Sequence, residues 1–254
     1  MTRLLVALAI VASGATLVTE AQGRAFGFRR GEPILPNPPY DGQFTFVRLR
    51  YGPDYGVAAQ AIPWSHDYPI GERHFMRILG EVSYLRPKMD ETAVFSLDDP
   101  ELCRYPVAYM AEPGLWSISE KEATAFRAYL LKGGFVIFDD FSEERGGWAR
   151  FEHAFRRVLP DARFYDLDAT HRIFHSFFEI NSLDIVPQAY DYGRPVFRAV
   201  FEQNDPARRM IAMINYNTDI SEYWEGAGSG FRPAWETNEA YKLGVNYVMY
   251  GMTH

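Results

Sequence analysis

The sequence predicts an α/β domain in which helices cover both faces of a mostly parallel sheet. Between residues 44 and 141, segments typical of strands and helices follow in the order strand, helix, strand, strand, helix, strand. The run FVIF at residues 135–138 is apolar without alternation, which is typical of a strand that is covered on both faces. We expect the crossovers between parallel strands to be right-handed.

The first predicted strand, residues 44–51, reads FTFVRLRY and is rich in β-branched and aromatic residues. Arg48 and Arg50 lie on one face of this strand, near its carboxyl end. We favour a solvent-facing edge for the pair, because charged side chains usually face water. Ligand binding is the alternative.

The loop after this strand, residues 55–69, contains Trp64 and His66. Its mixture of aromatic and polar side chains is typical of a ligand pocket, although packing of the loop on the sheet explains it equally well. The next predicted elements are a helix between residues 75 and 85 and strands at residues 92–97 and 107–110.

A complete helix-then-strand unit occupies residues 114–141. Ser119 and Glu122 have the spacing of a capping box, so we expect a helix to begin at Glu120. Gly133 suits the left-handed conformation that ends many helices. The buried strand at residues 135–138 then follows.

Asp139 and Asp140 directly follow that strand. Ligands of open α/β sheets bind beyond the carboxyl ends of the strands, so this pair lies where the fold places a site. Adjacent carboxylates raise each other's pKa, but neighbouring residues of a strand point to opposite sides. The alternative is structural: one carboxylate caps the next loop or pairs with Arg145, and the other faces solvent.

A second candidate site lies at residues 168–178, DATHRIFHSFF. His171 and His175 are four residues apart, so either a helix or a strand places both on one face. Zinc needs a third ligand, and the sequence has neither a His-Glu-x-x-His motif nor a cysteine cluster. We therefore favour structural histidines and predict no metal site.

The C-terminal part carries one more polar segment. Paired strands are expected at residues 196–201 and 209–214, and the polar run NYNTD follows them with Asn217 and Asp219. Such residues bind a ligand or a hard cation, but more often form turns. The other expected elements are a helix at residues 148–158, a strand at residues 163–168 and a helix over residues 240–251.

The N-terminus has the pattern of a secretory signal peptide at residues 1–23, with Arg3 before an apolar run at residues 4–18. An uncleaved membrane anchor is the alternative. A proline-rich extended segment at residues 24–43 precedes the domain, which we place at residues 44–254. The sequence therefore predicts an exported protein, periplasmic or extracellular.

The net charge and the cysteine content argue against some classes of binding partner and exclude an intramolecular disulfide. The net charge is -7, and removal of residues 1–23 leaves it unchanged, because Arg3 and Glu20 cancel. This charge argues against nucleic acid as a partner and, after signal cleavage, against an anionic membrane. Cys103 is the only cysteine, so no intramolecular disulfide is possible. We predict no cofactor.

Several segments together resemble a bacterial family of domains of unknown function. They are FTFVRLRY, YLLKGGFVIFDDF, HRIFHSFF, NYNTDI and EAYKLGVNYVMYGMT. That family is grouped with the class I glutamine-amidotransferase-like superfamily and is similar in topology to trehalose-utilisation-like proteins. The resemblance covers residues 44–252 and implies a single-domain, flavodoxin-like three-layer α/β sandwich.

The sequence departs from that superfamily at the nucleophile. Amidotransferases carry a reactive cysteine on the turn after a buried strand. The comparable turn here carries Asp139 and Asp140, while Cys103 lies elsewhere, and no Gly-x-Ser-x-Gly elbow is present. Hydrolysis of glutamine by a cysteine is therefore not expected.

Two functions remain open. We favour a non-catalytic domain that binds a small polar ligand in a strand-end cleft, or engages an envelope protein. The residues expected to contact the ligand are Arg48, Arg50, Trp64, His66, Asn217 and Asp219. The alternative is a hydrolase, carbohydrate-directed in one version. It would use Asp139 or Asp140 with His171 or His175, with or without a metal.

Overall fold

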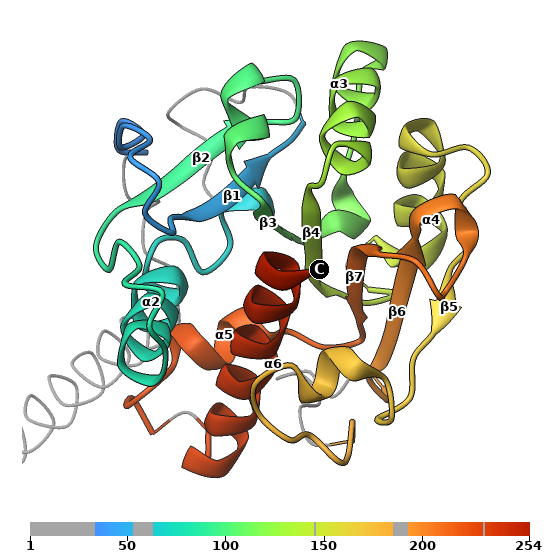
Figure 1. Cartoon of the computed structure of the whole chain (residues 1–254). Coiled ribbons are helices and arrows are strands. Elements are labelled where there is room, and N and C mark those ends of the chain that lie inside the picture. Colours follow the sequence, from blue (N-terminus) through green and yellow to red (C-terminus); the bar gives the residue numbers. More distant parts are fainter. Residues whose placement is uncertain (1–33, 53–62, 145, 185–192, 231) are drawn as a thin grey trace, which may run out of the picture. The chain divides into compact units, whose positions relative to one another are not determined.

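The computed structural model describes residues 34–52, 63–144, 146–184, 193–230 and 232–254 (Figure 1). The predicted signal peptide, the first ten residues of the proline-rich segment and Arg145 lie outside the described residues. So does most of the loop predicted at residues 55–69. The predictions for those segments stay predictions.

The described residues form one seven-stranded sheet with the strand order β2-β1-β3-β4-β7-β6-β5. Five neighbouring strands from β2 to β7 are parallel, and β6 is antiparallel to both of its neighbours. The strands are β1 (Phe46–Arg50), β2 (Thr92–Ser96), β3 (Val107–Ala111), β4 (Phe135–Phe141), β5 (Tyr165–Asp166), β6 (Val196–Phe201) and β7 (Met210–Tyr216). From β1 the chain passes to β2 on one side, and from β2 it crosses to β3 on the other side of β1. The gap between β1 and β3 is therefore the topological switch point of the sheet.

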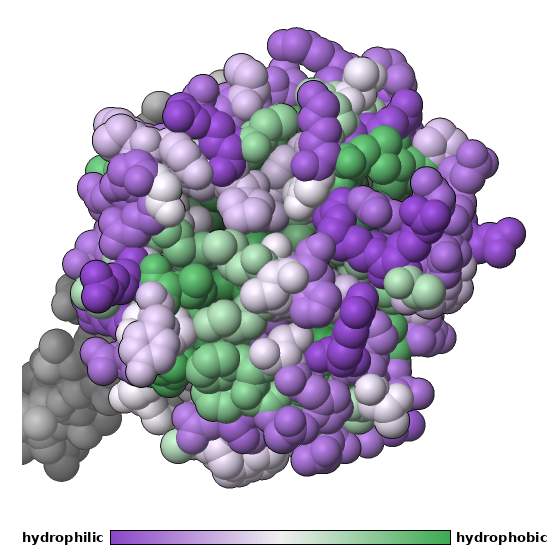
Figure 2. Space-filling view, viewed as in Figure 1, coloured by the Kyte–Doolittle hydropathy of each residue, from purple (hydrophilic) through white to green (hydrophobic). Residues whose placement is uncertain are grey.

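Helices cover both faces of the sheet, as predicted (Figure 1). The helices are α2 (Ile70–Val82), α3 (Glu120–Leu131), α4 (Gly147–Val158), α5 (Ile220–Glu225) and α6 (Ala234–Thr253). One apolar core lies between the sheet and α3 with α4, and the other lies between the sheet and α2, α5 and α6. Figure 2 looks onto the side of the molecule with α6, where apolar residues gather and hydrophilic residues surround them. The predicted three-layer α/β sandwich is confirmed.

The strand β4 shows why its sequence lacks alternation. Val136 and Phe138 face the core under α3 and α4, and Ile137 faces the core under α6. Each side chain is at most 3% exposed. Burial on both faces removes the need for polar residues at every second position.

The predicted start of α3 is confirmed at Glu120. The hydroxyl of Ser119 accepts a hydrogen bond from the backbone N–H of Glu122, and the carboxylate of Glu122 accepts one from the backbone N–H of Ser119. Other boundaries differ. The helix α2 ends at Val82 rather than near residue 85, because the next residue, Ser83, is extended and its hydroxyl donates back to the carbonyl of Leu79. The strand predicted at residues 163–168 is reduced to the two residues of β5.

A β-bulge lies where β4 meets β7. Phe138 pairs with Ile214 and Phe141 with Tyr216, so Asp139 and Asp140 together stand opposite the single residue between the two partners. Asp140 takes a φ of 59°, in the left-handed region. A bulge re-aims side chains, so strict alternation no longer sets the direction of this pair.

Candidate functional site

Arg48 positions the segment that leads into the site. It is completely buried on β1, contrary to the predicted solvent-facing edge, and its Nε donates to a carboxylate oxygen of Glu72 on α2. Its Nη1 donates to the carbonyl oxygens of Trp64 at 3.0 Å and His66 at 2.7 Å. The prediction was wrong for Arg48 because β1 is an interior strand and Glu72 neutralises the charge. Arg50, at the end of the strand, is exposed.

His66 follows the short helix η1 (Pro63–Ser65), and one third of its side chain is exposed. Its Nδ1 lies 2.8 Å from Oδ2 of Asp140 and 3.4 Å from Oδ1 of Asp67. Burial lowers the pKa of His66, but the charges of Asp67 and Asp140 outweigh burial and raise the pKa far above its ordinary value. His66 therefore holds its proton more strongly than a free imidazole does, between the carboxyl groups of Asp67 and Asp140.

Asp139 joins β4 to the start of α5. Its carboxylate accepts hydrogen bonds from the hydroxyl of Tyr109 at 2.7 Å, the side-chain amide of Asn215 at 3.0 Å, and the backbone N–H groups of Ile220 at 3.0 Å and Ser221 at 3.3 Å. Complete burial and the negative charge of Asp219 raise the pKa of Asp139 to about 7, while these hydrogen-bond donors oppose the rise. With both oxygens engaged, Asp139 is a structural carboxylate.

Asp219 caps the N-terminus of α5. Its Oδ1 accepts hydrogen bonds from the backbone N–H of Glu222 at 3.0 Å and the hydroxyl of Ser221 at 3.2 Å. Burial and the charge of Asp67 raise the pKa of Asp219. Burial and the charge of Asp219 raise that of Asp140 well above its ordinary value. The two carboxyl groups lie within hydrogen-bonding reach, so they can share a proton.

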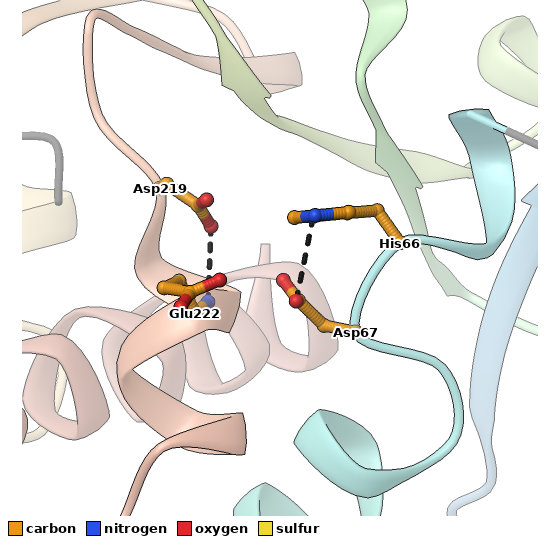
Figure 3. Close-up of side chains that lie close together, drawn as sticks. All are labelled: His66, Asp67, Asp219 and Glu222. Atoms are coloured by element: carbon orange, nitrogen blue, oxygen red, sulfur yellow. Dashed lines mark hydrogen bonds and ion pairs between the residues drawn. The ribbon is translucent and has the colours of Figure 1, made fainter. Parts of the chain in front are cut away.

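Five carboxylates converge on His66, and we call this set with His66 the acidic cluster. They are Asp67, Glu112, Asp140, Asp219 and Glu222. Ligand atoms of His66, Asp67, Asp219 and Glu222 all lie within 4.8 Å of one another, as do those of His66, Glu112 and Asp140. Figure 3 shows Asp219 and Glu222 at the start of α5 facing His66 and Asp67 in the segment before α2.

The backbone around the acidic cluster is strained. Asp67, Glu112 and Asp140 take φ values of 60°, 45° and 59°, where side chains other than glycine are disfavoured. Such conformations cost about 1–3 kcal/mol each and tend to persist at functional sites. Glu112 follows β3, and Asp140 lies at the end of β4. The acidic cluster thus lies beside the switch point, where the fold favours ligand binding.

The structure brings three of the residues proposed from the sequence into the acidic cluster: Asp140, His66 and Asp219. Asp139 lies beside Asp219 but has a structural role. His171 and His175 lie elsewhere, and among the described residues neither forms a hydrogen bond or ion pair with the acidic cluster. His171 caps the helix η4 (Arg172–His175) by accepting from the N–H of Ile173. His175 pairs with Glu179 at 2.5 Å and with the carbonyl of Ala169 at 2.7 Å.

Two other proposed contact residues also lie apart from the cluster. Trp64 is 3% exposed and packs in the core under α3 and α4. Asn217 donates to the carbonyl of Arg194 at 3.3 Å. Sequence reasoning missed Glu112 and Glu222, although Glu112 follows a predicted strand and Glu222 follows Asp219 with capping-box spacing.

The fold and the site define a flavodoxin-like α/β domain with a buried acidic cluster at its switch point. A family model described as "Domain of unknown function (DUF4159)" matches residues 45–252, so the chain belongs to this family. No curated protein matches the chain. Among the described residues, no helix has the length and apolar character required to cross a membrane.

Because of the acidic cluster, we expect the domain to be more stable at acidic than at alkaline pH. Burial first, and then nearby carboxylates, raise the pKa of Glu222 to about 8, against an ordinary value of 4.5, and raise those of Asp140 and Asp219 from 3.8. From about pH 4 to about pH 8 the folded chain thus holds protons that the unfolded chain releases, so stability falls as pH rises. The proton on His66 acts in the same direction above its unfolded pKa of 6.5.

Thermal unfolding in chelator-containing buffer at about pH 5.5 and about pH 8 checks this prediction. We expect a higher Tm at the lower pH, and a smaller difference in Glu222→Gln, which cannot titrate at that position. An equal or higher Tm at about pH 8 would contradict it.

Proposed function

We propose that the domain binds a small polar ligand at the acidic cluster and hydrolyses it by acid–base catalysis. The observation that carries this proposal is the 2.8 Å pair between His66 Nδ1 and Asp140 Oδ2, at the strand ends where this fold favours ligands. A hydroxyl-rich ligand such as a carbohydrate suits the site, because its O–H groups can donate to carboxylate oxygens.

The chemistry follows from the charges of the pair. Hydrolysis needs one group to take a proton from the attacking water and another to give a proton to the leaving group. His66 is partly exposed and its Nδ1 lies 2.8 Å from Asp140, so it can act as the acid, and a carboxylate of the cluster can act as the base. This assignment replaces His171 and His175 as partners of the acidic pair.

We also propose that the domain is related to the amidotransferase-like superfamily. Attack by water without a covalent intermediate is compatible with that relation. The order of strands and helices supports that relation. The turn after β4 begins at Ser142, which is fully buried, and Cys103 is exposed on the helix η2 (Pro100–Arg104). A covalent intermediate on either side chain is therefore not part of the proposal.

A non-catalytic binding role is the second candidate, and burial favours it. Asp140 is completely buried and Asp219 is 2% exposed, so only His66 and Glu222 offer partly exposed atoms for a ligand. In this version the ligand is bound and not cleaved, or an envelope protein is the partner. Export to the periplasm or the extracellular space is part of both versions and rests on the pattern of residues 1–23.

A hydrolysis screen separates the two candidates. Wild type, Asp140→Asn and Cys103→Ser would be compared on chromogenic glycosides and esters. The proposal expects turnover in wild type, a loss of about 100-fold or more in Asp140→Asn, and no change in Cys103→Ser. Turnover that survives in Asp140→Asn would rule out this role for the pair. Saturable binding of a sugar without turnover would favour the non-catalytic domain.

A further inference from the structure

We propose that His66, Asp67, Asp219 and Glu222 bind one divalent cation. The inference deepens the proposed function, because the cation would lie in the same acidic cluster, but it does not require hydrolysis. It also goes beyond the sequence, which predicted no metal site.

The distances within this set suit a single ion. One ligand atom from each of the four residues lies within 4.8 Å of the others. Ligands that contact one ion at about 2.0–2.4 Å are at most about 4–5 Å apart, so small adjustments bring all four into contact. The ligands come from two segments, one before α2 and the other at the start of α5 (Figure 3).

Asp219 supplies an observation that is independent of the clustering. Its Oδ2 is buried and accepts no hydrogen bond from an N–H or hydroxyl donor of the described residues, and the whole residue is 2% exposed. The carboxyl group of Asp140 lies within hydrogen-bonding reach of Asp219, so two buried acidic groups face each other here, and a cation relieves the cost of ionising both. In Figure 3 the Asp219 carboxylate points from its backbone toward the side on which His66 and Asp67 lie.

The neighbouring groups hold these carboxylates in place. The hydroxyl of Ser221 lies 2.6 Å from Oδ2 of Asp67 and 3.2 Å from Oδ1 of Asp219. The N–H of Glu222 donates to the same Oδ1. These contacts occupy the oxygens that we do not assign to the ion, as the groups around a metal site commonly do.

The donor set indicates the class of cation. Three carboxylates and one imidazole form a mixed nitrogen and oxygen set, which suits Mn²⁺ or Zn²⁺ better than Ca²⁺, whose ligands are oxygens. The acidic groups of Glu112 and Asp140 also lie beside His66. A ligating nitrogen carries no proton, so the ion would replace the His66 proton as the positive charge of the cluster. In the cation-bound state His66 would therefore not be the acid of the proposed hydrolysis.

Calorimetric titration of the purified full chain, freed of metal by a chelator, tests the site with Mn²⁺ and Zn²⁺. We expect one ion per chain in wild type and affinity about 10- to 100-fold weaker in Asp219→Asn. Asp90→Asn removes the same charge from an exposed position and should leave the affinity unchanged. Glu222→Gln is the second variant in case Asp219→Asn does not fold. This change keeps the backbone N–H of residue 222, which donates a hydrogen bond to Asp219.

The outcomes decide separately on the two proposals. Absence of saturable binding in wild type, or affinity unchanged in both cluster variants, would overturn the cation site. Tight binding without turnover of any substrate in the screen would support the ion and count against the hydrolase.

Discussion

Replacing Asp139 by alanine is expected to lower the free energy of unfolding by about 3–5 kcal/mol, because four buried donors lose their acceptor at once. The donors are the Tyr109 hydroxyl, the Asn215 amide and the N–H groups of Ile220 and Ser221. Relief of repulsion with Asp219 offsets part of the loss. The start of α5, which carries Asp219 and Glu222, loses its main attachment to β4.

Urea denaturation of Asp139→Ala and Asp90→Ala measures this effect. Asp90 is exposed and pairs with Arg77 at 3.4 Å, so its loss should change stability by no more than about 0.5 kcal/mol. Asp139→Asn keeps the shape and should lie between wild type and Asp139→Ala. A change below about 1 kcal/mol in Asp139→Ala would show that Asp139 does not have the structural role assigned to it.

Replacing Arg48 by methionine is expected to cost a similar amount, about 3–5 kcal/mol, because it leaves the Glu72 carboxylate buried without its partner. The carbonyls of Trp64 and His66 lose their donor as well. Arg50→Met, two residues along the same strand, removes an exposed arginine and should be nearly neutral.

The double variant Arg48→Met with Glu72→Leu separates charge from positioning. An apolar replacement of both partners of a buried ion pair is often neutral, so most of the lost stability should return. Affinity for Mn²⁺ should stay reduced, because the carbonyl of His66 still lacks the Arg48 donor. If the double variant recovers both stability and affinity, Arg48 balances charge and does not position His66.

The pair Arg48 and Arg50 shows how far the sequence reaches. Strand pattern places both on one face, and the structure agrees that they share a strand. Their environments differ because Glu72 reaches Arg48 from a helix twenty-four residues later in the chain. A partner that remote leaves no local pattern, so the sequence predicts the fold class and the strand but not the burial of this charge.

The acidic pair after β4 gives the same lesson for the site. The sequence places Asp139 and Asp140 at the carboxyl end of a buried strand, where a site is expected. It cannot show that a bulge gives Asp140 a positive φ, because the bulge depends on pairing with β7. Nor can it show that His66, rather than His171, meets Asp140, because that contact joins segments far apart in the chain.

Anomalous diffraction from crystals soaked in Mn²⁺ is the most direct measurement of whether the acidic cluster is the functional centre of this domain. We expect one strong peak with atoms of His66, Asp67, Asp219 and Glu222 within about 2.5 Å. The peak should disappear in Asp219→Asn and persist in Asp90→Asn. An empty cluster in soaked wild-type crystals, or a peak bound only to surface carboxylates, would contradict the site.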